Sequence, residues 1–148
     1  MTFVNVNNKD IKLVQRRLNK LKQKSKVAVS TGIGKWKQDT ENDAKRAAKF
    51  SQEFSMGFLR QSIQSGVANK SAYVEAYANY APYVEFGTGR KVDLSHLEKM
   101  GIKKSYAEQF KGRGPKDVNL PARPFLYPAA HKRLKVLLEY LEKEIKRL

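Results

Sequence analysis

The chain lacks cysteine, has few acidic residues for its many basic ones, and contains no long apolar run. The absence of cysteine excludes disulfides and thiolate zinc sites. No apolar run reaches the roughly 18–20 residues that span a bilayer, and the first residues lack the layout of a signal peptide. We therefore expect a protein made in the cytoplasm, with no membrane partner. The two histidines, His96 and His131, have no paired ligand spacing, so neither a metal nor another cofactor is expected.

Positive charge is what the chain has in excess. Its 148 residues include 30 Lys and Arg against 14 Asp and Glu, for a formal net charge of +16. Such an excess predicts a nearby polyanion, but duplex DNA, RNA, an anionic membrane and an acidic protein surface all meet that demand. The charge is concentrated in residues 1–37, with ten basic residues and one acidic, and in residues 90–123, with nine basic and four acidic.

Apolar periodicity predicts helices at residues 9–24, 28–54 and 128–148. In the first, apolar residues recur at three- and four-residue steps, at Ile11, Val14, Leu18 and Leu21. The last begins near Pro128, which suits a first helical position. Its apolar stripe consists of Leu134, Leu137 or Leu138, Leu141, Ile145 and Leu148.

A hairpin is predicted at residues 59–78, because large and small side chains alternate from Ala72 to Ala78 after a turn at Asn69-Lys70-Ser71. Residues 90–119 hold several glycines among lysines, with a short apolar set at Leu94, Leu97, Met100 and Ile102, and predict a long basic loop with room for one helical turn. The order of elements predicts a single α+β domain over residues 1–148. A small antiparallel sheet would be packed by the N-terminal helices and a C-terminal helix.

Two segments carry a family resemblance. Residues 80–89 read YAPYVEFGTG, and residues 121–130 read PARPFLYPAA, with a final helix after them. This pair resembles the gp-ten-like tail-component family of long-tailed bacteriophages, which is distantly similar to the minor tail protein Z of phage lambda. Residues 56–63, MGFLRQSI, lie where the family carries TGxLRxSI, although Met56 replaces the usual Thr. The long insertion at 90–119 is a second departure.

The resemblance implies a structural role in the virion and no enzymatic activity. It implies a tail-completion subunit of the head-to-tail neck, assembled in the host bacterial cytoplasm as a homo-oligomer, expected to be a hexameric ring around the DNA channel. The neighbours expected for this ring are the head-closure (stopper) and tail-terminator proteins.

The motif residues are expected to form the subunit interface. Pro and Gly fix or permit unusual backbone angles there, and the aromatic residues Tyr83, Phe86 and Phe125 are of the kind that anchor interfaces. Glu85 is expected to pair with Arg123 or with a base of a neighbouring subunit. The full set is Tyr80, Pro82, Tyr83, Glu85, Phe86, Gly87, Thr88, Arg123, Pro124 and Phe125.

A second set of residues is a candidate for non-specific contact with duplex DNA through phosphates. It consists of Lys12, Arg16, Arg17, Lys20, Lys24, Lys103, Lys104, Lys111 and Arg113. The basic first helix is either a solvated face balanced by acidic neighbours or the lining of a DNA channel, and the sequence leaves both open. The alternative function is a free basic nucleic-acid-binding protein, either a phage regulator or a ribosome-associated protein.

No catalytic constellation is visible in the sequence. Gly32-Ile33-Gly34-Lys35 fails the spacing of a phosphate-binding loop, and Gly87-Thr88-Gly89 lacks the third glycine of a dinucleotide fingerprint. Both sets of glycines are interpreted as structural.

Overall fold

The computed structural model describes residues 8–48, 57–68, 71–89, 92–95, 97, 99, 102–110 and 120–147. Its elements in chain order are α1 (Asn8–Ala47), α2 (Gly57–Ser62), β1 (Ile63–Ala68), β2 (Ser71–Ala76), α3 (Ala81–Phe86), α4 (Lys104–Glu108) and α5 (Tyr127–Lys146). Helices combine with a two-stranded antiparallel sheet, so the predicted α+β class is confirmed.

The first two predicted helices, 9–24 and 28–54, are one helix. Helix α1 runs unbroken for 40 residues. Residues 25–27 contain neither proline nor glycine, and the Ser25 hydroxyl donates a 3.0 Å hydrogen bond to the Lys22 carbonyl within the helix. The predicted break was therefore wrong, because nothing in these residues stops a helix. Residues 49–54 of the second prediction lie outside the described residues.

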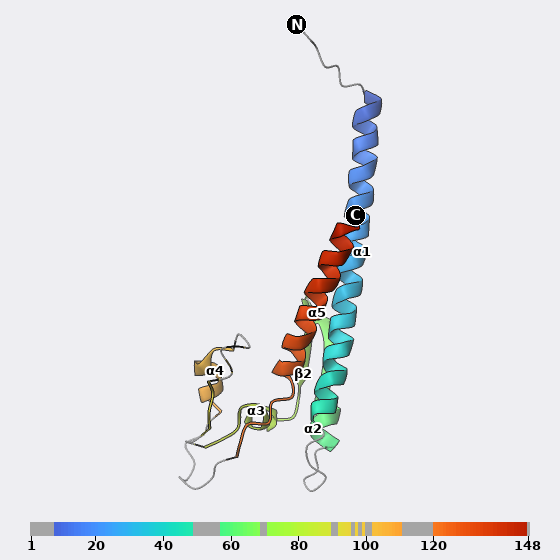
Figure 1. The fold of residues 1–148 in the computed structure, drawn as a ribbon. Coiled ribbons are helices and arrows are strands. Elements are labelled where there is room, and N and C mark those ends of the chain that lie inside the picture. Colours follow the sequence, from blue (N-terminus) through green and yellow to red (C-terminus); the bar gives the residue numbers. More distant parts are fainter. Residues whose placement is uncertain are drawn as a thin grey trace.

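Helix α5 lies antiparallel along the C-terminal half of α1 (Figure 1). The Trp36 indole N–H donates to the Ala130 carbonyl at 3.4 Å, at the start of α5. Closer to the N-terminus of α1, a Cβ added at Gly32 would stand 2.8 Å from Leu137 Cδ1 and 3.1 Å from the Tyr140 ring. Glycine thus lets the two helices approach closely, which offsets its cost of about 1 kcal/mol in a helix.

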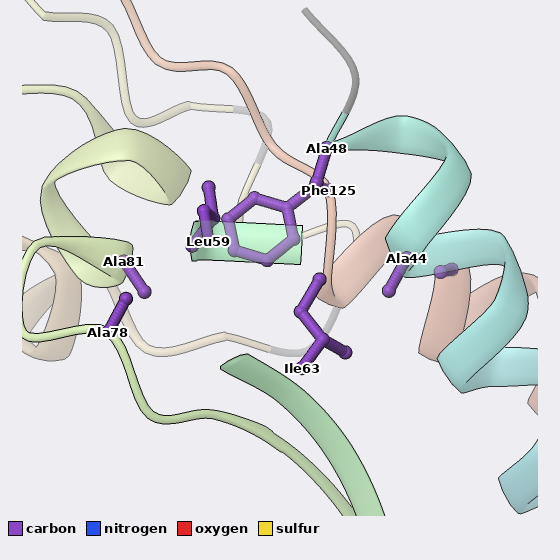
Figure 2. Packing of buried hydrophobic residues seen from close by; sticks show 8 residues of the cluster. Ala44, Ala48, Leu59, Ile63, Ala78, Ala81 and Phe125 are labelled. Carbon is purple, nitrogen blue, oxygen red and sulfur yellow. The ribbon is translucent and has the colours of Figure 1, made fainter. Parts of the chain in front are cut away.

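The hairpin is confirmed, with a shorter range than predicted. β1 pairs with β2 in the register Ile63↔Ala76 to Ala68↔Ser71, and residues 59–62 belong to α2 instead of a strand. The hairpin packs on α1, and α5 packs mainly on α1. The main core lies where these elements meet (Figure 2) and consists of Ala44, Ala48, Leu59, Ile63, Ala78, Ala81, Phe125 and Ala129.

The predicted basic loop, 90–119, contains a second core. Among its described residues, Leu94, Leu97, Ile102 and Ala107 are buried together with Phe86, and α4 forms part of this cluster. The Phe86 ring lies 5.8 Å from Tyr106, 5.6 Å from Phe110 and 5.6 Å from Tyr127, between ring centroids. The prediction of a loop with one helical turn did not include this core, and the one helix described in the segment is the short α4. Met100 and residues 111–119 lie outside the described residues.

Candidate functional site

The two motif segments, far apart in the sequence, pair with each other through their backbones. Thr88 and Leu120 form an antiparallel bridge with N–H···O distances of 3.0 and 2.9 Å. The Arg123 N–H donates to the Val84 carbonyl at 2.8 Å. We call this contact between residues 80–89 and 120–130 the motif junction. It joins α3 to the start of α5.

Gly87 is required at the motif junction for two reasons. Its φ is +73°, a conformation that residues with a Cβ adopt rarely. A Cβ would also stand 2.7 Å from both the Ala122 nitrogen and the Leu120 carbonyl oxygen. These contacts are backbone atoms and cannot move aside as a side chain does, so the two segments lie this close only with glycine here.

Glu85 is enclosed in the motif junction, with 3% of its surface exposed. Its carboxylate accepts hydrogen bonds from the backbone N–H groups of Phe125 at 2.8 Å, Leu126 at 3.0 Å and Tyr127 at 3.0 Å. These groups lie at and just before the first turn of α5, where a helix leaves N–H donors without intrahelical acceptors. The carboxylate satisfies them and favours the positive end of the helix dipole.

The expected pairing of Glu85 with a base of a neighbouring chain is therefore wrong, because the carboxylate is buried within its own chain. The other expected partner, Arg123, stays a prediction. The role of Glu85 is to hold α5 against α3. The sequence pointed to this residue but not to this function.

The ten predicted interface residues fall into three groups. The buried ones are Glu85, Phe86, Gly87 and Phe125; the half-buried ones are Pro82, Thr88 and Pro124; the exposed ones are Tyr80, Tyr83 and Arg123. Phe86 and Phe125 are only 2% and 1% exposed, so the prediction that they anchor a neighbouring subunit was wrong. Both rings fill cores of their own chain. Among the predicted interface residues, the aromatic side chains exposed to solvent are Tyr80 and Tyr83, at 37% and 45%.

A pocket of about 270 Å³ lies beside Glu85 and is lined by residues of both motif segments and of β2. Tyr127 lines it, and burial, together with the neighbouring Tyr106, raises the pKa of this phenol to about 12. The phenol is therefore neutral at physiological pH. Across the described residues, no group of three or more His, Asp or Glu side chains is arranged to hold a metal ion.

The N-terminal half of α1 is the second candidate site. Lys12, Arg16, Arg17, Lys20 and Lys24 are all exposed. Helical spacing places Lys12, Arg16 and Lys20 opposite the stripe of Ile11, Val14, Leu18 and Leu21, and Arg17 and Lys24 on one flank of it. This half of the helix projects beyond the end of α5 (Figure 1). No helix in the described part of the chain has the length and apolar character needed to cross a bilayer.

The predicted phosphate-facing residues that the structure describes do not form one patch on the chain. Lys103 and Lys104 are exposed at the start of α4, which lies at the opposite end of the molecule from the projecting half of α1 (Figure 1). Lys111 and Arg113 lie outside the described residues.

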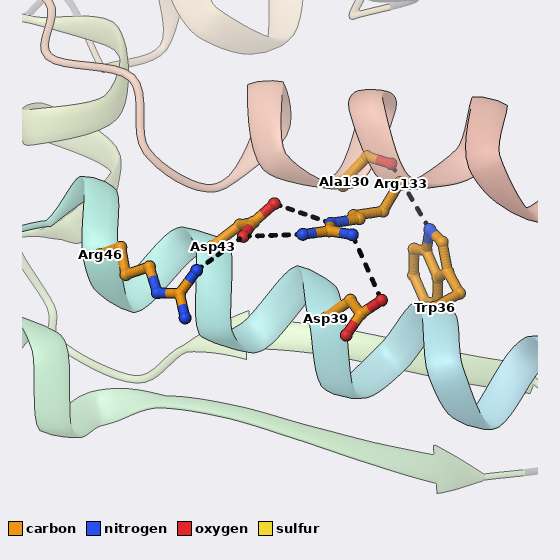
Figure 3. A network of polar contacts seen from close by, with 6 residues as sticks. All are labelled: Trp36, Asp39, Asp43, Arg46, Ala130 and Arg133. Atoms are coloured by element: carbon orange, nitrogen blue, oxygen red, sulfur yellow. Dashed lines mark hydrogen bonds and ion pairs between the residues drawn. The ribbon is translucent and has the colours of Figure 1, made fainter.

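A polar network between α1 and α5 was missed by sequence reasoning (Figure 3). Arg133 donates from Nε and Nη2 to the two carboxylate oxygens of Asp43 at 2.7 and 3.0 Å, and from Nη1 to Asp39 at 3.2 Å. The hydrogen bond from Arg133 is the main reason that the pKa of Asp43 is lowered. The available signal was the four-residue spacing of the two aspartates, which puts both carboxylates on one helical face.

Comparisons with known protein families, with curated proteins and with solved structures find no match to this chain.

Proposed function

We propose that this chain is a structural virion protein of a tailed bacteriophage, a tail-completion ring subunit that joins head to tail around the DNA channel. The observation that carries this proposal is the motif junction. The two segments that resemble the tail-component family, residues 80–89 and 121–130, fold against each other with Gly87 and Glu85 at the points of closest contact.

A ring subunit must hold its contact surfaces at a constant angle so that identical interfaces close. The junction supports this requirement because Glu85 ties the start of α5 to α3, and the pairing of Thr88 with Leu120 ties the two segments to each other. Tyr80, Tyr83 and Arg123 are exposed on this rigid support. They are the motif residues available to neighbouring subunits.

The charge of the chain fits a position around duplex DNA. Eight of residues 9–26 are Lys or Arg and one is Asp, in a helix that projects from the body of the subunit. Residues 8–24 contain no aromatic side chain that would stack on bases. Contact with the genome would therefore be with phosphates, without sequence preference.

The proposed partners are further copies of the chain in a hexameric ring, with the head-closure and tail-terminator proteins on its two sides. The second candidate is a free basic nucleic-acid-binding protein, which the net charge of +16 favours. That candidate accounts for the charge but gives no role to the motif junction.

Sedimentation and electron microscopy of the purified chain separate these two functions. At high protein concentration, a neck subunit forms closed rings with a central opening, in the absence of nucleic acid. A free nucleic-acid-binding protein instead remains a monomer or dimer and binds duplex with a steep dependence on salt. The second result, found also with isolated phage tails present, would overturn the proposal.

A further inference from the structure

Two exposed apolar stripes remain uncovered in the described structure. The α1 stripe consists of Ile11, Val14, Leu18 and Leu21, which are 43%, 54%, 58% and 39% exposed. The α5 stripe consists of Leu134, Leu138, Leu141 and Ile145, of which Leu141 is half-buried and the others are 45%, 53% and 66% exposed. Large apolar side chains grouped in this way mark surfaces that another molecule covers.

The α1 stripe continues the face of α1 that α5 already covers. Steps of three and four residues lead from Leu21 through Ser25 and Ala28 to Gly32 and Trp36, which contact α5. Beyond the end of α5, this face meets no other described element (Figure 1). The α1 stripe therefore extends a face of α1 that already packs against a helix.

The two stripes match in length and spacing. The α1 stripe advances by steps of 3, 4 and 3 residues, and the α5 stripe by steps of 4, 3 and 4. At 1.5 Å per residue, each is about 15–17 Å long. Stripes with this alternation are the seams of helices that pack with interlocking side chains. Run antiparallel, the residues of the two stripes come to within one residue of each other along the helix axes. Helices α1 and α5 already pack antiparallel within the chain.

Charge disfavours pairing of an α1 stripe with a second α1 stripe. The positions that flank it include Arg17, Lys22 and Lys24, so two copies would bring like charges together. The positions flanking the α5 stripe carry both signs, with Lys135 and Glu142 on one side and Glu144, which is paired with Arg147, on the other. Pairing α1 with α5 is the less repulsive arrangement. It also covers both stripes of every subunit, whereas an isologous dimer through either stripe leaves the other exposed.

We infer that the α1 stripe of one subunit packs on the α5 stripe of the next, in a heterologous contact that closes the ring. This inference rests on the proposed function and names the surfaces by which copies of the chain assemble. Because the contact joins two different surfaces, it generates a ring when the rotation closes. The basic face of α1, opposite the stripe, stays exposed in the assembly.

Disulfide trapping tests this contact cleanly because the chain has no cysteine of its own. In the double variant L18C/L138C, both thiols lie in the middle of the stripes. Within one subunit they cannot meet, because Tyr140 lies beside Lys35 and Leu18 is 17 residues further along α1. That separation is about 25 Å, against the Cα distance of about 4–7 Å that a disulfide needs.

The matched control is L13C/V136C, whose positions are both 48% exposed and lie on the same two helices, away from the stripes. Mild oxidation should give a ladder of oligomers, ending at the ring, for L18C/L138C. The control and each single variant should give no ladder.

Three results would overturn the inference. Rings that form but give no ladder would reject this interface and leave the proposed function standing. Dimers trapped by L18C alone would assign the α1 stripe to isologous pairing. A chain that stays monomeric in every variant, also with isolated phage tails present, would reject both proposals. Binding of that monomer to phosphatidylglycerol vesicles, abolished in L18E but kept in L13E, would assign the stripe to a lipid surface instead.

Discussion

The carboxylate of Glu85 and the backbone N–H of Phe125 form a 2.8 Å hydrogen bond that joins α3 to the start of α5. Two further backbone donors, at Leu126 and Tyr127, share the same carboxylate. All three bonds are charge-assisted; the one from Phe125 is buried and the other two are partly buried, so they are stronger than in water. Glu85, which was expected from the sequence to lie in a subunit interface, thus stabilises the fold of its own chain.

Replacing Glu85 by Ala should lower the free energy of unfolding by about 3 kcal/mol, because one buried and two partly buried N–H donors lose a charged acceptor. Glu85→Gln should lose less, since one side-chain oxygen remains to accept from Phe125 and Leu126. Urea denaturation measures both, with the exposed Glu75→Ala on β2 as control. A Glu85→Ala variant as stable as the unmodified chain would contradict this role.

Two glycines of α1 should respond differently to the same substitution. Gly34→Ala should raise the free energy of unfolding by about 1 kcal/mol, because Gly34 is exposed, helical and has no atom near the added Cβ. Gly32→Ala should gain less or lose stability, because its Cβ would stand 2.8 Å from Leu137 Cδ1. Thermal unfolding of the two variants compares them directly. An equal gain at both positions would mean that α5 does not pack this closely on α1.

The pH dependence of stability should report the network of Asp43 and Arg133. Arg133 lowers the pKa of Asp43 below its ordinary value of 3.8, so the unfolded chain binds this proton more readily than the folded one. The stabilisation is complete above pH 3.8 and is lost as the pH falls through the lowered pKa of the folded state.

The Asp43→Asn variant should therefore be less stable than the unmodified chain at pH 7. On acidification, its free energy of unfolding should fall by less than that of the unmodified chain. Urea denaturation between pH 7 and pH 2 measures this, with Glu142→Gln, an exposed carboxyl on α5, as control. An Asp43→Asn variant with an unchanged acid profile would show that Arg133 does not hold this carboxylate in solution.

Binding to duplex DNA should depend on the projecting half of α1. Replacing Lys12, Arg16 and Lys20 by Gln should reduce the slope of log affinity against log salt by about 2–3, because each DNA phosphate that a cation neutralises adds about 0.9 to that slope. Replacing three exposed lysines of α5, Lys132, Lys143 and Lys146, removes the same charge and is the control. Equal reductions from both triple variants would show that DNA does not bind α1 in preference to α5. The basic side of α1 would then be a solvated face.

Local patterns in the sequence predict local structure well. The three- and four-residue steps from Ile11 to Leu21 predict a helix, and the alternation from Ala72 predicts a strand; both are present. The break predicted after Lys24 is absent, since a change in amphipathic pattern does not end a helix without proline, glycine or a competing cap.

Burial of the motif aromatics could not be predicted in the same way. Phe86 is buried by Leu94, Leu97 and Ile102, which stand among lysines and show no helical or strand period. Phe125 is buried by residues of α1 and α2, far away in the sequence. Whether such a ring fills a core or an interface depends on these distant contacts. The candidate site was therefore found by its motif, and its internal role only through the structure.

Cryo-electron microscopy of intact virions, from a phage that carries this gene, tests the neck assignment most directly. We predict a closed ring of this chain between head and tail, with the α1 stripe of each subunit on the α5 stripe of the next and the basic face of α1 exposed. Mature particles with a fully resolved neck and no copy of this chain would contradict the assignment.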